Sequence, residues 1–501
     1  MFTRAVCART AQAASHRACF KVGLRRFKIY HLRKSNDESL FTYTTGRFLY
    51  NERARLRERY VPFNTTALKQ AISKHVGHGH VQSLTKLSEG GFNRVLLATM
   101  EDGFKAIVKI PYWISVPRTY VTTSEVATLT FLRSKGIPVP EVYGWSSSST
   151  TDKPIGVEYI IMEHVPGYQK HALVTGIVDV EKRLFSIPFG AVGSIYFKKD
   201  VETRFQAPLY VPGTVDEDGD GDVYCIGPSA DYMFWYGRRG GGRLIGGLDY
   251  LVATAEKEVK WVEKYSKPLE PDFPHNTVFP GVRQPQEYLE LLRKYQSIAP
   301  YLLPRELGRP TLRHPDLTPS NVFICPDTFK VTSIIDWQHT FITPLVLAAG
   351  YPRLFENPDP EPPTGLIPPK YPPEYDDETR RKGPSRQWSG NMISLRGALM
   401  RICELWPHLS VPDECPIRFS EQEVREQAES ERMWYDLNAL VGHWRRELGG
   451  LSEEGWIPAE NYDAAVQRNE SLREEFSDGA SPDELGKIRR GWPFRDLEDF
   501  Y

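Results

Sequence analysis

His314-Pro315-Asp316-Leu317-Thr318-Pro319-Ser320-Asn321 is the stretch that decides the fold, together with Asp336, which follows Asp316 by 20 residues. Two apolar runs with a turn between them, 322–324 and 330–335, predict a β-hairpin that joins this loop to Asp336. Phosphoryl transfer needs a carboxylate that accepts the proton of an attacking hydroxyl, and oxygen ligands that hold Mg²⁺. The pattern therefore predicts Asp316 as a catalytic residue, and Asn321 and Asp336 as magnesium ligands. The alternative is a structural turn in which Asp316 and Asn321 cap backbone groups.

The chain upstream of this loop has the pattern of a small antiparallel sheet, because short β-branched runs alternate with turn residues. Thr122-Thr123-Ser124 offers caps for a helix that ends at Gly136 and Pro138. Strands are predicted at 81–86, 95–100, 106–110, 141–145 and 157–162. Five strands with one helix after the third is a specific order, and the sequence after 167 is mainly helical.

Lys109 lies within the third predicted strand, between apolar neighbours. In a strand such a lysine is commonly the solvent-facing member of the alternation. In a kinase-like lobe it instead reaches the α- and β-phosphates of a nucleotide and pairs with a carboxylate of the helix. Glu125, in the only predicted helix of this lobe, is the expected partner.

A turn between the first two strands reads Ser88-Glu89-Gly90-Gly91-Phe92-Asn93. Glycine lets backbone amides approach phosphate oxygens closely. We expect Gly90, Gly91 and Asn93 to belong to a loop that covers the nucleotide.

The composition is ordinary for a globular protein, with 40% hydrophobic and 25% charged residues. A net charge of −1 gives no overall attraction to nucleic acid or to an anionic membrane. The six cysteines are scattered without a CxxC pair, which suggests neither a disulfide framework nor a zinc site. No apolar run approaches the roughly 18 residues of a membrane-spanning helix. The acidic run 216–222 lacks the glutamate of a calcium loop at its twelfth position, so we expect a solvated loop.

Residues 1–36 contain nine basic residues before the first acidic one, Asp37, with alanine and serine between them. A basic, acid-poor amphipathic segment predicts a mitochondrial targeting segment, with the import machinery as partner. The alternative is a basic tail that binds a polyanion. The expected division is a targeting segment 1–36, an N-terminal extension and nucleotide-binding lobe 37–165, and a helical lobe 166–501. Two insertions are expected at about 214–247 and 351–384, the second because of its ten prolines.

These motifs resemble the aminoglycoside phosphotransferase and choline kinase-like superfamily, and within it the fungal mitochondrial group called altered inheritance of mitochondria protein nine. The resemblance covers about residue 41 to the C-terminus. It rests on the stretches quoted above and on three others, Phe41 to Tyr60, Met162-Glu163-His164-Val165-Pro166-Gly167 and Ile335-Asp336-Trp337-Gln338-His339-Thr340. It implies an α+β, bilobal protein kinase-like fold, with a small five-stranded antiparallel sheet in the N-lobe and a large, mainly helical C-lobe.

The same resemblance implies a role for each matching residue. Asp316 becomes the base, with His314 a structural member of the catalytic loop. The other implied positions are the metal ligands Asn321 and Asp336, the phosphate-binding Lys109, and an adenine-binding hinge around Glu163 to Val165. Trp337-Gln338 after Asp336 departs from the Phe-Gly of protein kinases, and Pro315 stands where many active relatives carry glycine.

The sequence thus predicts an ATP- and Mg²⁺-dependent phosphotransferase of the mitochondrion, acting on a small-molecule acceptor that the sequence does not identify. Nucleic acid is not expected as a partner. The alternative is a catalytically weak or inactive kinase-like factor that binds nucleotide or a protein partner.

Overall fold

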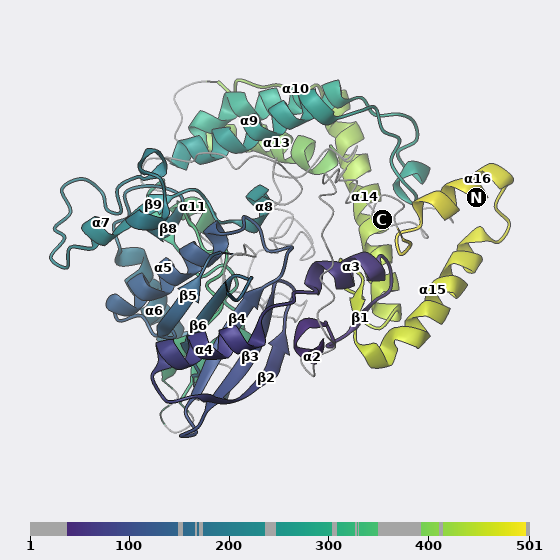
Figure 1. The fold of residues 1–501 in the computed structure, drawn as a ribbon. Coiled ribbons are helices and arrows are strands. Elements are labelled where there is room, and N and C mark those ends of the chain that lie inside the picture. The colour runs from purple at the N-terminus through teal and green to yellow at the C-terminus, as the bar shows by residue number, and fades with distance from the viewer. Residues whose placement is uncertain are drawn as a thin grey trace.

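The computed structural model describes residues 38–148, 154–165, 168–169, 174–235, 247–302, 308–325, 328, 330–348, 392–409 and 414–496. Figure 1 shows a small sheet on one side and long helices on the other, with the N-terminal segment lying between the sheet and the C-terminal helices. The predicted targeting segment and the proline-rich insertion 351–384 lie outside the described residues.

The sheet of the N-lobe has five strands in the order β2-β3-β4-β6-β5, and every neighbouring pair is antiparallel. One helix, α5 (Tyr120–Ser134), follows the third strand of this sheet. The strands are β2 (Val81–Glu89), β3 (Asn93–Met100), β4 (Lys105–Pro111), β5 (Val142–Ser146) and β6 (Tyr159–Glu163). The predicted α+β class and the strand order of the small lobe are confirmed.

The sheet is covered on both faces, because alternate strand residues point to opposite sides. Val108 and its neighbours on one face pack with Leu68 and Ile72 of α4 (Thr65–Val76). Ile107 on the other face packs near Val126 of α5. Lys109 has the same parity as Ile107, so the strand directs it to the side of α5 rather than towards α4.

The N-terminal extension consists of α2 (Glu38–Phe41), β1 (Arg47–Phe48) and α3 (Glu52–Arg59). It joins the two ends of the molecule, because β1 pairs with β14 (Trp456–Ile457) near the C-terminus. Helix α3 lies against the body, and the side that it buries includes Arg55 and Arg59. The guanidinium of Arg59 pairs with Glu454 at 2.6 Å. The extension therefore connects the sheet to the C-terminal helices independently of the hinge after β6.

The described part of the chain after β6 is mainly helical, as predicted. Its helices of eight or more residues are α6 (Val174–Ser186), α9 (Gly247–Tyr265), α10 (Pro285–Ile298), α13 (Ile393–Leu405), α14 (Glu421–Glu447), α15 (Tyr462–Ser477) and α16 (Pro482–Gly491). Its short strands are β7 (Tyr168–Gln169), β8 (Ser194–Phe197), β9 (Tyr224–Gly227), β10 (Pro310–Leu312), β11 (Val322–Ile324), β12 (Val331–Ile334) and β13 (Ile342–Pro344). Its short helices are α7 (Asp220–Val223), α8 (Tyr232–Trp235) and α11 (Leu345–Ala348).

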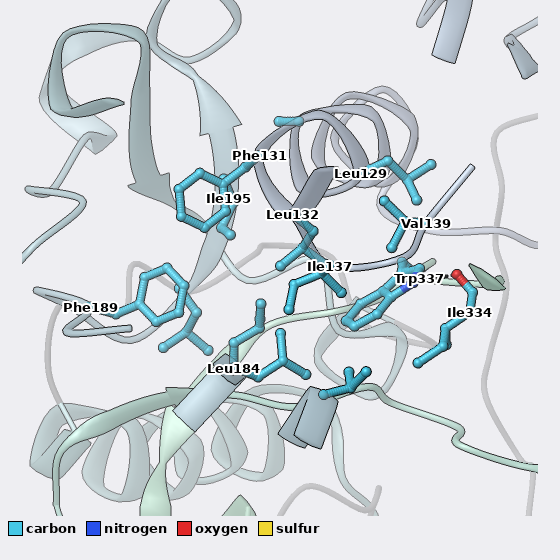
Figure 2. Packing of buried hydrophobic residues seen from close by; sticks show 14 of the residues in the cluster. Leu129, Phe131, Leu132, Ile137, Val139, Leu184, Phe189, Ile195, Ile334 and Trp337 are labelled. Carbon is cyan, nitrogen blue, oxygen red and sulfur yellow. Dashed lines mark hydrogen bonds between the residues drawn. The ribbon is translucent and has the colours of Figure 1, made fainter. Parts of the chain in front are cut away.

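A hydrophobic core links α5 to the predicted catalytic segment. Figure 2 shows Trp337 and Ile334 beside Val139 and Ile137. Trp337 is fully buried, and its indole N–H donates to the carbonyl oxygen of Ile334 at 2.8 Å. The residue after Asp336 therefore anchors the loop that presents this carboxylate.

The range 214–247 is less irregular than the sequence suggests. Its strand β9 pairs with β8, and Tyr224 and Ile226 belong to the core that contains Trp337. The acidic run, expected to be a solvated loop, is a turn that leads into α7, and Asp216 accepts the backbone amides of Asp220 and Gly221 at 3.0 and 2.7 Å. Asp220 itself is buried and pairs with Lys135. No cluster of three metal-binding His, Cys, Asp or Glu side chains occurs in the part of the chain that the structure describes.

The sequence suggests neither a membrane-spanning helix nor a disulfide framework, and the described residues bear on both. None of their helices is both long and apolar enough for a membrane span. Their four cysteines, Cys225, Cys325, Cys403 and Cys415, are free thiols.

Candidate functional site

Lys109 is the centre of a buried charge cluster between the sheet and the large lobe. Its Nζ lies 2.7 Å from Oε1 of Glu125 on α5 and 2.9 Å from Oδ1 of Asp336. Burial lowers the pKa of Lys109, but the two carboxylates, with Asp336 the larger influence, more than reverse this and raise it. The lysine is therefore a fixed cation rather than the solvent-facing member of a strand.

Glu125 is buried on α5, and burial raises the pKa of its carboxyl group. The positive charge of Lys109 opposes that shift. A buried carboxylate without a partner is costly, so the pair holds α5 against β4.

His314 fixes the backbone of the predicted catalytic loop. Burial lowers the pKa of its imidazole, which favours the neutral ring. The Nε2–H donates to the carbonyl oxygen of Ile335 at 2.9 Å, and Nδ1 accepts the amide of Asp316 at 3.1 Å. Both ring nitrogens are therefore engaged in hydrogen bonds to backbone groups, which agrees with a structural rather than a proton-transferring role.

Asn321 lies next to Asp316, because its side-chain amide donates to the backbone oxygen of Asp316 at 2.8 Å. The same amide lies 3.5 Å from the Asp316 carboxylate. The strand β11 starts directly after Asn321 and pairs with β12, and the amide of Ile335 donates to the carbonyl of Asn321 at 2.9 Å. The predicted hairpin thus brings Asp336 back beside Asn321.

Asp336 has a left-handed backbone conformation, with φ of +65°. Such a conformation in a residue other than glycine is strained and is held by its surroundings. The side chain is 46% accessible, so it faces an open space. Lys109 lowers the pKa of the Asp336 carboxyl group, which keeps it ionised.

The turn with Gly90 and Gly91 lies between β2 and β3, as predicted. The amide of Gly90 donates to the carbonyl of Asn93 at 2.9 Å. A Cβ atom built on Gly91 would meet no atom within 4 Å, so the space beside this loop is open. The side chain of Asn93 hydrogen-bonds to Gln338, two residues after Asp336.

The base of this glycine loop is held by Glu89 and Arg94, which face each other across β2 and β3. Arg94 is fully buried, and its Nε donates to Glu89 at 3.1 Å. Thr44 and Thr45 of the extension also donate to the Glu89 carboxylate, at 2.8 to 3.1 Å. Burial would raise the pKa of Glu89, but the bonds from Thr44, Lys86 and Thr45 lower it overall.

The predicted hinge begins at Glu163, the last residue of β6. The backbone amide of Glu163 donates to the carbonyl of Glu141 at 2.8 Å, and its carboxylate accepts the amide of Glu141 at 3.0 Å. The side chain therefore fixes the edge of the sheet. Val165 follows at the exit of the strand and is partly buried, whereas Pro166 and Gly167 lie outside the described residues.

The structure brings the side chains of Lys109, Glu125 and Asp336 together directly, and places Asp316 and Asn321 on the adjoining loop. Sequence reasoning missed three residues that contact this site, namely Gln338, His339 and Tyr232. Gln338 and His339 carry a weak signal, since polar residues that follow a buried strand end commonly lie at a site. Tyr232, from a range predicted to be irregular, gave no signal.

No family model matches this sequence. A curated relative, a subtelomeric hrmA-associated cluster protein of Aspergillus fumigatus, is 29% identical, and the match covers 83% of this chain and 97% of the relative. The mitochondrial protein altered inheritance of mitochondria protein 9 of Yarrowia lipolytica is also 29% identical, over 40% of each chain. The protein of the same name in Candida tropicalis is 24% identical, over 62% of this chain and 60% of its own.

Among solved structures, the aminoglycoside phosphotransferase APH(4)-Ia matches at 13% identity and a TM-score of 0.33, over 83% of this chain and all of its own. A streptomycin–ATP complex of APH(2″)-IIa matches at 15% identity and a TM-score of 0.32, over 57% of this chain and 74% of its own. At these scores the fold class rests on the strand order and the helix after the third strand. The sequence matches confirm the resemblance stated from the motifs: the chain is similar to proteins named altered inheritance of mitochondria protein 9.

Proposed function

We propose that this chain is an ATP- and Mg²⁺-dependent phosphotransferase that acts on a small-molecule acceptor. The observation that carries the proposal is the contact of Lys109 with both Glu125 and Asp336. A lysine paired with a helix carboxylate, beside a loop that carries an aspartate and an asparagine, is the set of groups that phosphoryl transfer from ATP requires.

The donor set fits magnesium. Mg²⁺ is commonly held by one or two protein oxygen ligands, with waters and nucleotide phosphates as the others. Asn321 and Asp336 are the two residues that would hold it, and the accessible carboxylate of Asp336 faces open space. The ion would neutralise charge on the phosphates during transfer.

Each residue of the chain then has a role. Asp316 orients the acceptor hydroxyl and accepts its proton, while His314 and Asn321 hold the backbone on which Asp316 stands. Lys109 binds the α- and β-phosphates. The glycine loop, with Gly90, Gly91 and Asn93, covers the nucleotide, and the backbone from Glu163 to Val165 receives the adenine.

We also place the protein in the mitochondrion, with residues 1–36 as its targeting segment, residues 37–165 as extension and N-lobe, and 166–501 as C-lobe. The support is the basic, acid-poor start of the sequence, together with the printed names of several relatives as mitochondrial proteins.

The test is the variant Asp316→Ala. It should abolish ATP-dependent phosphorylation of acceptors, found by screening metabolite extracts for phosphorylated products, while the affinity for MgATP stays within about twofold of wild type. Asp222→Ala, at an exposed position of α7, is the matched control and should leave transfer unchanged. Transfer at the wild-type rate by Asp316→Ala would show that this residue is not the base.

A second candidate is a kinase-like factor that binds nucleotide or a partner without transfer. Two observations favour it: Pro315 precedes Asp316, and Asn93 of the glycine loop is bonded to Gln338. Thermal unfolding with ATP alone and with ATP plus Mg²⁺ tests whether the protein binds the nucleotide, because a ligand of the folded state raises the melting temperature. A Mg²⁺-dependent rise without any product in the metabolite screen supports the non-catalytic factor.

A further inference from the structure

Residues 229–235, between β9 and the end of α8, touch three parts of the candidate nucleotide site. These parts are the glycine loop, the segment after Asp336, and the helix that carries Glu125. The proposed function assigns no role to this segment.

The first contact is with the glycine loop. The ring centroid of Tyr232 lies 4.8 Å from that of Phe92, in an edge-to-face arrangement at 62°. The backbone of Phe92 is itself fixed, because its carbonyl accepts the hydroxyl of Ser115 at 2.6 Å and the amide of Tyr112 at 2.8 Å. Tyr232 therefore packs on the only aromatic residue of the loop, Gly90 to Asn93.

The second contact is with the segment that follows Asp336. The Nδ1–H of His339 donates to the carbonyl of Ala230 at 2.9 Å. The His339 ring also packs against both Tyr232 and Phe92, with centroids 5.6 and 5.3 Å away, so the three rings contact one another. Its Nε2 is buried and has no hydrogen-bond partner among the described residues, so packing rather than polar bonding holds this side of the ring.

The third contact is with the start of α5. The indole ring of Trp235 stacks on Tyr120, the first residue of that helix, with centroids 6.2 Å apart and an angle of 25°. Its Nε1–H donates to the carbonyl of Ser229 at 2.6 Å, which fixes the ring within the segment. Helix α5 carries Glu125, so its N-terminal end is held by the same seven residues.

The segment is also anchored to the large lobe. The hydroxyl of Ser194 on β8 accepts the amide of Ala230 at 2.9 Å and donates to the carbonyl of Thr340 at 2.8 Å. One side chain thus joins the segment to the chain four residues after Asp336. The three contacted parts are the ones whose relative placement decides whether a kinase-like site can bind and align MgATP.

We propose that residues 229–235 act as a clamp that sets the glycine loop, the Asp336 segment and helix α5 in one arrangement, with Tyr232 and Trp235 as positioning residues. The effect on nucleotide binding rests on the proposed function, whereas the clamp itself is a property of the nucleotide-free protein.

The experiment uses the full chain with Tyr232→Leu and Trp235→Leu, and with Tyr232→Phe as the conservative variant that keeps the ring. Tyr265→Leu, at an exposed tyrosine of α9, is the matched control. Hydrogen exchange is followed without nucleotide at the Gly90 amide, which is bonded to Asn93, and in the peptide 337–340. The affinity for MgATP is measured in parallel, well below the melting temperature of each variant.

Tyr232→Leu should speed hydrogen exchange at Gly90 and in 337–340 by about tenfold, because the free energy of local opening is lower in this variant. It should weaken MgATP binding by about five- to twentyfold, with Tyr232→Phe and Tyr265→Leu close to wild type. Trp235→Leu should speed exchange at the start of α5. Unchanged exchange at Gly90 in a folded Tyr232→Leu protein would overturn the clamp.

Two further outcomes are informative. If Tyr232→Leu does not fold, Phe92→Leu tests the same contact from the loop side and should give the same faster exchange at 337–340; unchanged exchange there overturns the clamp. If wild type shows no MgATP binding at all, the proposed function fails, while the exchange results still decide the clamp.

Discussion

Lys109 and Asp336 form an ion pair of 2.9 Å between residues 227 positions apart in the chain. The lysine expected at the phosphates and the carboxylate expected at the metal therefore neutralise each other in the nucleotide-free protein. Under the proposed function, binding of MgATP would replace this contact by lysine–phosphate and carboxylate–metal contacts. The ion pair thus holds these two side chains in place in the absence of a ligand.

Replacement of Asp336 tests this relationship. We expect Asp336→Ala to remove the Mg²⁺-dependent part of the stabilisation by ATP and to weaken MgATP binding by about tenfold or more, because the metal loses a ligand. The pKa of Lys109 should fall, because the variant lacks the carboxylate that raises this pKa most.

Thermal unfolding with ATP, with and without Mg²⁺, is the measurement. Stability without ligand should change by no more than about 1 kcal/mol, since the accessible side chain is well solvated. Glu202→Gln, at an exposed surface ion pair, serves as control. A full Mg²⁺-dependent shift in Asp336→Ala would remove Asp336 from the metal site.

Asn321 combines an oxygen ligand with an amide that holds Asp316, and two substitutions separate these roles. Asn321→Asp keeps the oxygen but loses the donor to the Asp316 carbonyl, so we expect Mg²⁺ dependence to persist while the free energy of unfolding falls by about 1–3 kcal/mol. Asn321→Ala should lose both properties. Equal Mg²⁺ responses in the two variants would argue that the side-chain oxygen is not a ligand. Urea unfolding and metal titration give the two quantities.

The buried pair Glu89–Arg94 at the base of the glycine loop should dominate the stability of the small lobe. Arg94→Met leaves the carboxylate of Glu89 buried with fewer donors, so we expect a loss of about 3–5 kcal/mol in unfolding free energy.

The double variant Glu89→Leu/Arg94→Met should be less destabilised than the sum of the single variants, as a double-mutant cycle in urea would show. Strict additivity would mean that the two side chains do not interact. Arg204→Met, at an exposed position, controls for the loss of an arginine.

His275 predicts a pH dependence of stability. It is buried against Trp434, neither ring nitrogen has a hydrogen-bond partner among the described residues, and burial lowers its pKa from 6.5 to about 3. Between these values the unfolded chain binds the proton more readily than the folded one, so stability falls as the pH falls. Between pH 7 and pH 5 the loss should be about 2 kcal/mol.

The variant His275→Phe keeps a ring against Trp434 and removes the titrating group. Its unfolding free energy should vary less between pH 7 and pH 5 than that of wild type, while exposed His443→Gln should follow the wild-type profile. Parallel pH profiles for wild type and His275→Phe would contradict the assignment.

The parts of the site that the sequence predicts are those encoded locally. Asn321 and Asp336 flank one short hairpin, so the apolar runs between them predict that they lie close together. Lys109 and Glu125 are 16 positions apart and lie on a strand and on the helix that follows it. In each case the two residues are close in the sequence, so the predicted strands and helix between them are enough to bring them together.

The contacts that the sequence does not predict join distant segments. Asn93 meets Gln338 across 245 positions, and Arg59 meets Glu454 across 395. A charged helix such as α3 normally predicts a solvated surface. Arg59 is buried because it lies over the ring of Phe48 and meets Glu454, in the segment just before β14. Strand β9 was missed because a run of four residues fits a loop as well as a strand.

The pairing of Phe48 with Trp456 bears on the order in which the parts of the chain fold. A contact between residues so far apart closes slowly, because the chain must first lose the entropy of a very long loop. The segment that leaves the ribosome early can take its final place only when almost the whole polypeptide has followed. Until then Arg59 on α3 lacks its partner Glu454, and a chaperone that shields this side of the helix would raise the yield of native protein.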